Sequence, residues 1–146
     1  AEWELDDAAR QVKLVDVLQF IAESRPQDEP LRVAVMLSAW DLVETADRIG
    51  PGVAAELPKD PSAFLTRRWP LLDQFLRSHT KVFPSRVFGV SARGGGNSQQ
   101  EIARLVEVTR PSDRIILVDG SHRSNDITRP ARWLLGLLDS GLSPDG

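Results

Sequence analysis

The chain has 146 residues, of which 41% are hydrophobic and 27% charged, a composition typical of one globular domain. The formal net charge of -3 gives no basic excess, so we expect no nucleic-acid partner. Cysteine is absent, which excludes disulfides, thiolate metal sites and a cysteine nucleophile. No apolar run approaches the roughly 20 residues of a membrane span, and no basic-then-apolar leader opens the sequence, so we expect a cytoplasmic location.

The first predicted element is a helix over residues 3–23. Its apolar residues recur at steps of three and four, as on the buried face of an amphipathic helix: Leu5, Ala8, Val12, Val15, Leu18 and Ala22. Acidic residues in the first turn complement the helix dipole. The polar segment 24–30 contains two prolines, which end this helix before the next element.

An apolar run between Pro30 and Ser38 predicts a strand that is buried on both faces, as in a parallel sheet. The run ends in Ser38-Ala39-Trp40-Asp41, which places an acid at the carboxyl end of the strand. Ligands bind at this edge of open α/β sheets, so Asp41 is a candidate site residue. The structural alternative is that Asp41 only caps the turn that follows.

Residues 44–59 show weak periodicity and predict an irregular excursion with about one helical turn. A helix then starts at Asp60, a suitable N-cap, with Pro61 in the first helical position and a kink expected at Pro70, near Trp69. Residues 85–90 predict a second buried strand, followed by a loop that begins at Ser91. A strand, a helix and a strand of this spacing make the two strands parallel, so their carboxyl ends should meet at one edge.

The last third of the chain predicts a short helix at 99–106 that passes into a strand-like segment at 106–109, and then a strand over 114–120. Residues 111–113 between them suggest a hairpin, and residues 122–125 a polar turn. A closing helix is expected over 127–139, capped by Asn125 or Asp126. Its predicted inner residues are Trp133, Leu134, Leu137 and Leu138. The domain therefore covers residues 1–139, and residues 140–146 form a tail.

The two strand ends resemble the guanine-recognition motifs of P-loop GTPases. In that family the motif Asn/Thr-Lys-x-Asp, in which x is any residue, follows one strand. The motif Ser-Ala-Lys or Ser-Ala-Leu follows the next strand. Here the corresponding segments are Ser38-Ala39-Trp40-Asp41 and Ser91-Ala92-Arg93. Segments 114–120 and 125–135 are similar to the ends of bacterial double-GTPase proteins of conflict and signalling systems. The resemblance implies a three-layer α/β P-loop GTPase-like fold, present as its C-terminal portion: helix, strand, helix, strand, hairpin, helix.

The resemblance also implies roles for individual residues and GTP or GDP as the cofactor. Asp41 would accept hydrogen bonds from the ring N–H and the exocyclic amine of guanine. The backbone N–H of Ala92 would bind the guanine carbonyl oxygen, and Ser91 would steady the loop. In place of the family's base-covering lysine, Trp40 or Arg93 would stack on the base. The structural alternative for Trp40 is a buried core residue.

Two residues depart from the family pattern. Ala39 stands where the family has a lysine whose stem covers the base, and Ser38 stands where the family has the longer asparagine. Both departures favour an alternative function, in which a degenerate GTPase-like domain binds no nucleotide and serves as a protein-interaction module. An unrelated flavodoxin-like or receiver-type domain also stays open on periodicity alone.

The sequence lacks a Gly-x-x-x-x-Gly-Lys-Ser/Thr loop and an Asp-x-x-Gly segment, and the glycines at 94–96 are not followed by the lysine. The chain alone is therefore not expected to hydrolyse GTP, and Mg²⁺ would need a phosphate-binding half from elsewhere. The expected partners are this N-terminal half, lying before Ala1 or in another chain, or a second copy, because free strand edges invite pairing. The predicted function is guanine-nucleotide recognition within a GTPase-like regulatory protein.

Overall fold

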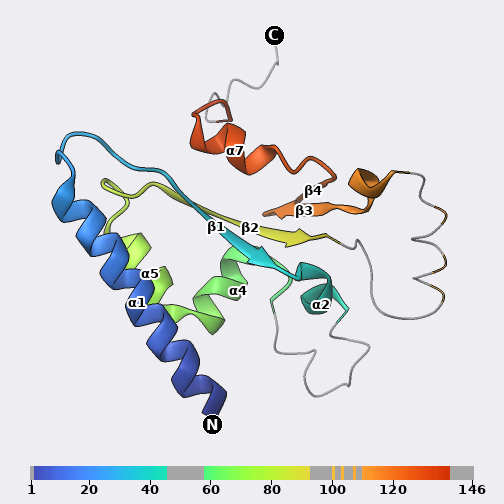
Figure 1. Ribbon diagram of the computed structural model, residues 1–146, viewed down its shortest axis with the longest axis horizontal. Coiled ribbons are helices and arrows are strands. Elements are labelled where there is room, and N and C mark those ends of the chain that lie inside the picture. The colour runs from blue at the N-terminus through green and yellow to red at the C-terminus, as the bar shows by residue number, and fades with distance from the viewer. Residues whose placement is uncertain are drawn as a thin grey trace.

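The structure is a computed structural model that describes residues 2–45, 58–92, 100, 103, 107 and 110–138. Its elements are shown in Figure 1. The helices are α1 (Glu2–Ser24), α2 (Trp40–Glu44), α4 (Pro61–Arg68), α5 (Pro70–Ser78) and α7 (Arg129–Leu134), with a 3₁₀ turn η2 at Pro111–Arg114. The strands are β1 (Val33–Ser38), β2 (Ser85–Ser91), β3 (Ile116–Asp119) and β4 (His122–Ser124).

The strands form one sheet in the order β1-β2-β3-β4. β1 and β2 are parallel, as the sequence predicts, in a register that runs from Val33 opposite Ser85 to Ser38 opposite Val90. The pairs β2–β3 and β3–β4 are antiparallel. A mixed α/β chain with this sheet is compatible with a P-loop-like fold.

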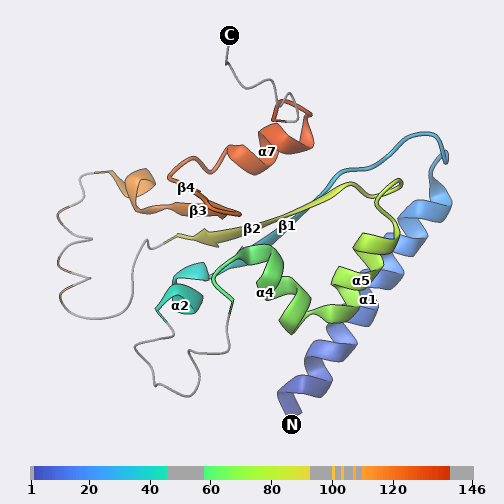
Figure 2. The same ribbon diagram turned by 180° about the vertical axis from the view of Figure 1, so that it is seen from behind.

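Helices cover both faces of the sheet, with α1, α4 and α5 on one face and α7 on the other (Figures 1 and 2). The larger core lies under α4 and α5, and strand residues Val33, Val35, Leu37 and Val87 pack against it. Its buried members are Leu65, Leu72, Phe75, Leu76 and Phe83. The smaller core, on the α7 face, contains Phe88, Leu117 and Trp133. Successive strand residues therefore serve different cores, as the pleat requires.

The break between α4 and α5 follows from local sequence. The Asp60 carboxylate accepts a hydrogen bond from the Ala63 N–H at 3.1 Å, and Pro61 takes the first helical position, so the predicted start is confirmed. At Trp69 the backbone leaves the helical region with φ -130° and ψ 58°. Pro70 then opens α5, so the predicted kink is a full break into two helices.

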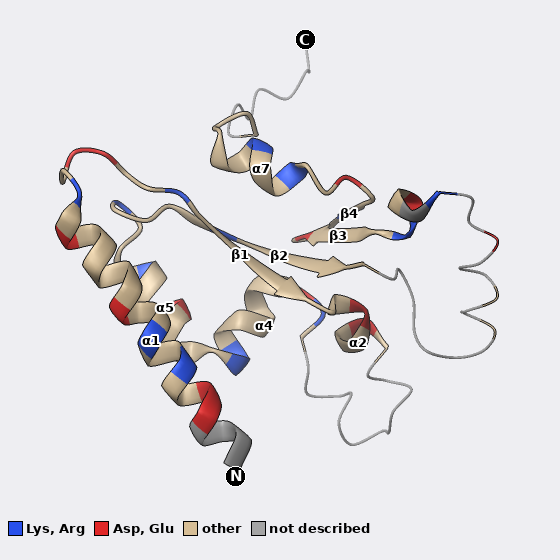
Figure 3. Cartoon of the chain, in the orientation of Figure 1, with Lys and Arg blue, Asp and Glu red and all other residues tan. Residues whose placement is uncertain are grey.

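The prediction that β1 is buried on both faces is wrong. Met36 is 44% exposed and Ser38 is also exposed. The reason is that β1 ends the strand order, so only β2 pairs with it in the described part of the chain. Figure 3 shows acidic and basic residues mixed along the helices, whereas the sequence of β1, Val-Ala-Val-Met-Leu-Ser, carries no charge.

The predicted hairpin is misplaced. Residues 111–114 form the 3₁₀ turn η2, and the hairpin instead joins β3 to β4 through Gly120, whose φ of 58° suits a tight turn. Residues 122–124, predicted as a polar turn, are strand β4. Gln100, Ala103 and Glu107 are helical, so Glu107 does not belong to the predicted strand-like segment. Other residues of 99–109 lie outside the described ranges.

The closing helix is shorter than predicted, because Gly136 adopts a positive φ of 77° just beyond it. Trp133 is buried and Leu138 packs against the smaller core, as expected. Leu134 and Leu137 are 44% and 61% exposed, so their predicted inward placement is wrong. The residues beyond 138, including the predicted tail, lie outside the described ranges.

Candidate functional site

The loop that joins β1 to α2 is a tight turn with a strained backbone. Ala39 has φ 53° and ψ 39°, and it is the only non-glycine residue with a positive φ in the described part of the chain. This left-handed conformation costs an alanine about 1–2 kcal/mol. It turns the chain from the strand directly into the helix, so Asp41 falls in the first turn of α2.

Asp41 is half-buried in this turn. Its backbone carbonyl accepts hydrogen bonds from the N–H and the hydroxyl of Thr45, at 2.9 and 2.7 Å. No described residue makes a hydrogen bond or an ion pair with its carboxylate, and α2 has no side-chain cap. The carboxylate therefore does not serve as a helix cap, which was the structural alternative for this residue, and both of its oxygens can accept hydrogen bonds from a ligand.

The segment that follows β2, the second predicted motif, lies at the same edge of the sheet as the turn at Asp41. β2 is parallel to β1 and ends at Ser91, one residue beyond the Ser38–Val90 pair, and α2 packs against β2 (Figure 1). Ser91 is 1% exposed, which suits a residue that steadies a loop, and Ala92 is exposed. Arg93 and the glycines at 94–96 lie outside the described residues. The structure thus brings the Asp41 and Ser91-Ala92 segments together at one edge.

Trp40 is a core residue. Its side chain is 1% exposed and packs edge-on against Phe64, with ring centroids 5.5 Å apart. It also lies so close over Gly89 that a Cβ atom there would be 2.5 Å from the Trp40 ring. The ring has no exposed face on which a base could stack, so Arg93 is the remaining candidate for that role.

An ion pair that the sequence did not predict links the turn at Asp41 to the hairpin of β3 and β4. Glu44, at the end of α2, binds Arg123 of β4. The two residues are 79 positions apart in the chain, and no local pattern links them. The packing of Trp40 and the ion pair of Glu44 thus fix the turn at Asp41.

A second cluster of charges joins β2, β3 and α7. Asp119, 7% exposed, accepts hydrogen bonds from Arg86 Nε at 2.9 Å and from Arg129 Nε at 2.7 Å. Burial alone would raise the pKa of Asp119, but the hydrogen bonds and charges of the two arginines outweigh it and lower that pKa below its ordinary value of 3.8. From the sequence, Asp119 was placed only within the predicted strand over 114–120, without this cluster.

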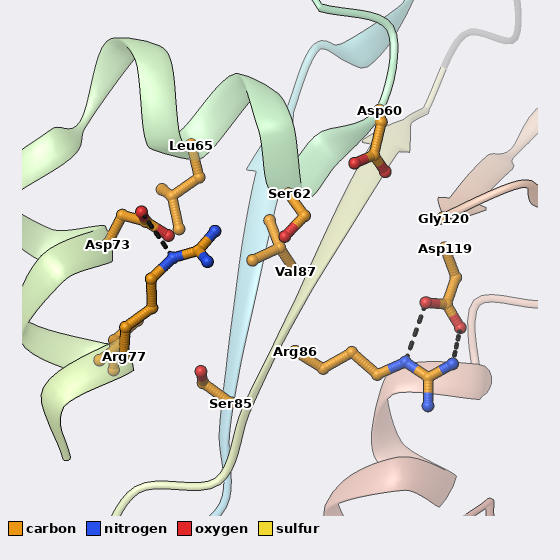
Figure 4. Close-up of a pocket in the computed structure, with 11 residues that line it drawn as sticks. Asp60, Ser62, Leu65, Asp73, Arg77, Ser85, Arg86, Val87, Asp119 and Gly120 are labelled. Carbon is orange, nitrogen blue, oxygen red and sulfur yellow. Dashed lines mark hydrogen bonds and ion pairs between the residues drawn. The ribbon is translucent and has the colours of Figure 1, made fainter. Parts of the chain in front are cut away.

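A cavity of about 440 Å³ lies beside this cluster, and Figure 4 shows its walls. Arg86 is bound by Asp119 on one wall, and Arg77 is bound by Asp73 at 2.9 Å on the other. Both arginines are thus already neutralised by carboxylates. The cavity also lies at the amino end of β2, next to Ser85, and so at the opposite end of the sheet from Asp41. These charges are structural ion pairs, so the carboxyl edge remains the candidate site.

The described residues contain no group of three or more His, Asp or Glu side chains placed to hold a metal ion. Among the same residues, no helix combines the length and the apolar character needed to cross a bilayer.

Comparison with known proteins identifies the family. The model of the family described as Double-GTPase 1 matches residues 1–134, which is most of the chain. No curated protein and no solved structure is significantly similar to the chain. The match agrees with the resemblance of the sequence to double-GTPase proteins. The chain belongs to the Double-GTPase 1 family.

Proposed function

We propose that this chain recognises a guanine nucleotide at the carboxyl edge of β1 and β2, as the base-binding part of a GTPase-like regulatory protein. The observation that carries the proposal is the Asp41 carboxylate, which has no partner among the described residues and lies at the edge where Ser91 and Ala92 also emerge. Membership of the Double-GTPase 1 family supports a GTPase-related function.

The chemistry of a carboxylate at this position selects guanine over adenine. Guanine presents two adjacent donors, the ring N–H and the exocyclic amine, and both can bind one carboxylate. Adenine presents an acceptor in place of the ring donor, so the carboxylate would repel it. Each hydrogen bond to a charged group contributes about 1.5–3 kcal/mol. The two together are enough to determine which purine is bound.

The other residues of the proposed site act around this contact. The Ala92 N–H would donate to the guanine carbonyl oxygen, and Ser91, buried beneath it, would hold the loop in place. Arg93 would stack its guanidinium on the base, since Ala39 has no stem to cover it. The ligand is GTP or GDP. We propose that its phosphates and Mg²⁺ are held by a phosphate-binding half outside this sequence, which hydrolysis would require.

A second candidate function is a protein-interaction module without nucleotide. It is favoured by Ala39 and Ser38, because these short side chains replace the two that would cover the base and bridge to the phosphate loop. The two candidates differ in one measurable property, since only the first requires a guanine-selective ligand.

Thermal unfolding of the complete native polypeptide with GTP, GDP or ATP separates the two functions. A ligand that binds only the folded state raises the melting temperature. We expect both guanine nucleotides to raise it and ATP to leave it unchanged. Asp41→Ala removes about 3–6 kcal/mol of binding free energy, or roughly 10²–10⁴-fold in affinity, and should abolish the shift.

Asp28→Ala is the matched control, because Asp28 is an exposed aspartate in the loop before β1, at the other end of the sheet. It should keep the full guanine shift. Equal shifts with ATP and GTP, or a guanine shift that survives Asp41→Ala, would contradict base recognition by Asp41. No shift with any nucleotide would leave the interaction module as the function.

A further inference from the structure

The helix that carries Asp41 is too short to hold its own position. α2 has five residues, whereas an isolated helix needs about 12–15 residues to be even marginally stable in water. No side chain caps its start, where Ala39 has a left-handed backbone conformation. The direction in which α2 presents the Asp41 carboxylate therefore depends on the contacts that this helix makes with other elements.

Two such contacts lie at the two ends of α2. The first residue, Trp40, packs against β2, and the last residue, Glu44, forms an ion pair with Arg123 of β4. Thr45, which follows Glu44, donates its N–H and its hydroxyl to the backbone carbonyl of Asp41. A shift of Glu44 is therefore passed to Asp41 within one helical turn.

Arg123 also offsets a repulsion inside α2. Asp41 and Glu44 are one helical turn apart, so their side chains share one face of the helix, and like charges at this spacing repel each other. The Glu44 side chain is 22% exposed and the Arg123 side chain 51% exposed. Loss of the arginine would leave a largely buried carboxylate without this partner and would favour a displacement of α2.

Arg123 is itself held by parts of the fold that lie away from the base contact. It is opposite Val118 in the β3–β4 pair. At the end of the same hairpin, Asp119 binds Arg86 of β2 and Arg129 of α7. The hairpin is thus joined to the sheet and to α7 at one point and to α2 at another, so it links the turn at Asp41 to the α7 face of the molecule.

We propose that Arg123 is a positioning residue of the base site, which holds α2 through Glu44 in the orientation that binds guanine and so couples nucleotide affinity to the β3–β4 hairpin. The inference rests on the proposed function and adds a means of regulating it. Coupling between two sites is reciprocal. A change that displaces the hairpin should therefore weaken guanine binding, and bound guanine should stabilise the hairpin.

The first measurement is the affinity of the complete native polypeptide for GDP, by isothermal titration calorimetry at a temperature at which every variant is folded. Arg123→Ala should weaken binding about fivefold, the upper range for a partly exposed ion pair. Arg10→Ala is the matched control, because Arg10 forms an exposed ion pair with Asp6 on α1. It should bind GDP like the wild type.

Two further variants separate a positioning role from a merely structural one. Arg123→Lys keeps the charge and should retain most of the affinity. Arg123→Ala placed in a Glu44→Gln background should change the affinity less than about twofold, because the carboxylate that the arginine binds is already absent. A residue that only stabilised the fold would lower the melting temperature and leave the affinity of the folded protein unchanged.

The second measurement needs no nucleotide. The N–H groups of Leu42 and Thr45 donate hydrogen bonds within the turn at Asp41, at 3.0 and 2.9 Å, so their hydrogen exchange, followed by NMR, reports on this turn. Arg123→Ala should speed exchange of both amides about fivefold relative to the amide of Phe83, a residue of the larger core.

The outcomes distinguish this inference from the proposed function. A wild type that binds no guanine nucleotide overturns both. A wild type that binds GDP overturns this inference alone if Arg123→Ala keeps the full affinity, if Arg10→Ala loses as much, or if the loss persists in the Glu44→Gln background. Unchanged exchange at the two turn amides also overturns it. If Arg123→Ala does not fold, Glu44→Gln removes the same ion pair and is judged by its affinity and exchange in the same way.

Discussion

Replacing Gly89 by alanine should destabilise the protein through its contact with Trp40. A Cβ atom at this position would lie 2.5 Å from Trp40 Cδ2, 2.6 Å from Cγ and 2.9 Å from Cε2. Favourable carbon contacts begin at about 3.5 Å, so the new methyl group would overlap the indole by up to about 1 Å. Neither partner can easily move, because Gly89 is in the middle of β2 and Trp40 is 1% exposed.

The expected loss of folding stability can be estimated from substitutions that overpack protein cores. An extra methyl group that forces a buried side chain to shift costs about 1–3 kcal/mol. For a chain of 146 residues, each kcal/mol lowers the melting temperature by about 2–4 °C, so the loss should be roughly 2–12 °C. Because Trp40 directly precedes Asp41, the shift should also displace the candidate base contact.

Thermal unfolding of a double-mutant cycle tests this account. Trp40→Leu alone should destabilise, because it leaves a cavity. Combined with Gly89→Ala it should cost less than the sum of the two single changes, since the smaller side chain makes room for the methyl group. A melting temperature of Gly89→Ala equal to the wild type, or strictly additive effects in the cycle, would refute the proposed overlap.

Two further predictions concern the charged residues that stabilise the fold. Asp119→Asn should lower the free energy of unfolding by about 2–4 kcal/mol at neutral pH, because Arg86 and Arg129 lose their carboxylate, whereas Asp113→Asn, an exposed control, should change little. The pKa of Asp119 is lowered in the folded state. The contribution of this residue to folding stability is therefore complete above the ordinary pKa of 3.8 and is lost as pH falls through the folded-state pKa. Urea titrations at several pH values should show this acid-dependent loss in the wild type and not in Asp119→Asn. Asp60→Ala should cost about 1 kcal/mol through loss of the cap on α4, and Ser62→Ala, an exposed residue in the first turn of the same helix, should be near neutral in the same assay; equal effects of the two would argue against the cap.

The sequence predicted the features that depend on neighbouring residues. The start of α4 at Asp60 and Pro61 is set by capping and was found as expected. The kink predicted at Pro70 is set by proline geometry, and it proved to be a full break between α4 and α5. The parallel pairing of β1 and β2 was also predictable, because the connection between them is long and helical. The position of Asp41 at a strand end follows from the same local pattern.

The features that the sequence did not predict depend on residues far apart in the chain. The burial of β1 was overestimated because an apolar run looks the same in a central strand and in a strand with one open edge. The cluster of Asp119 with Arg86 and Arg129 joins three elements, and no spacing rule identifies such a set. The hairpin was misplaced because Pro111 and Gly120 both signal turns, and only the strand pairing shows which one closes it.

In the proposed site, the fixed backbone of the turn at Asp41 would compensate for a missing side chain. By the resemblance to P-loop GTPases, Ala39 stands where a lysine would cover the base, and this alanine adopts a left-handed conformation that costs about 1–2 kcal/mol. Such strain persists only where the surroundings hold it, and here Trp40 packs over Gly89 while Glu44 binds Arg123. A carboxylate on a turn fixed in this way loses little freedom when it binds a ligand. A base contact at Asp41 therefore depends on Trp40 and Glu44, although neither touches the ligand in the proposed site.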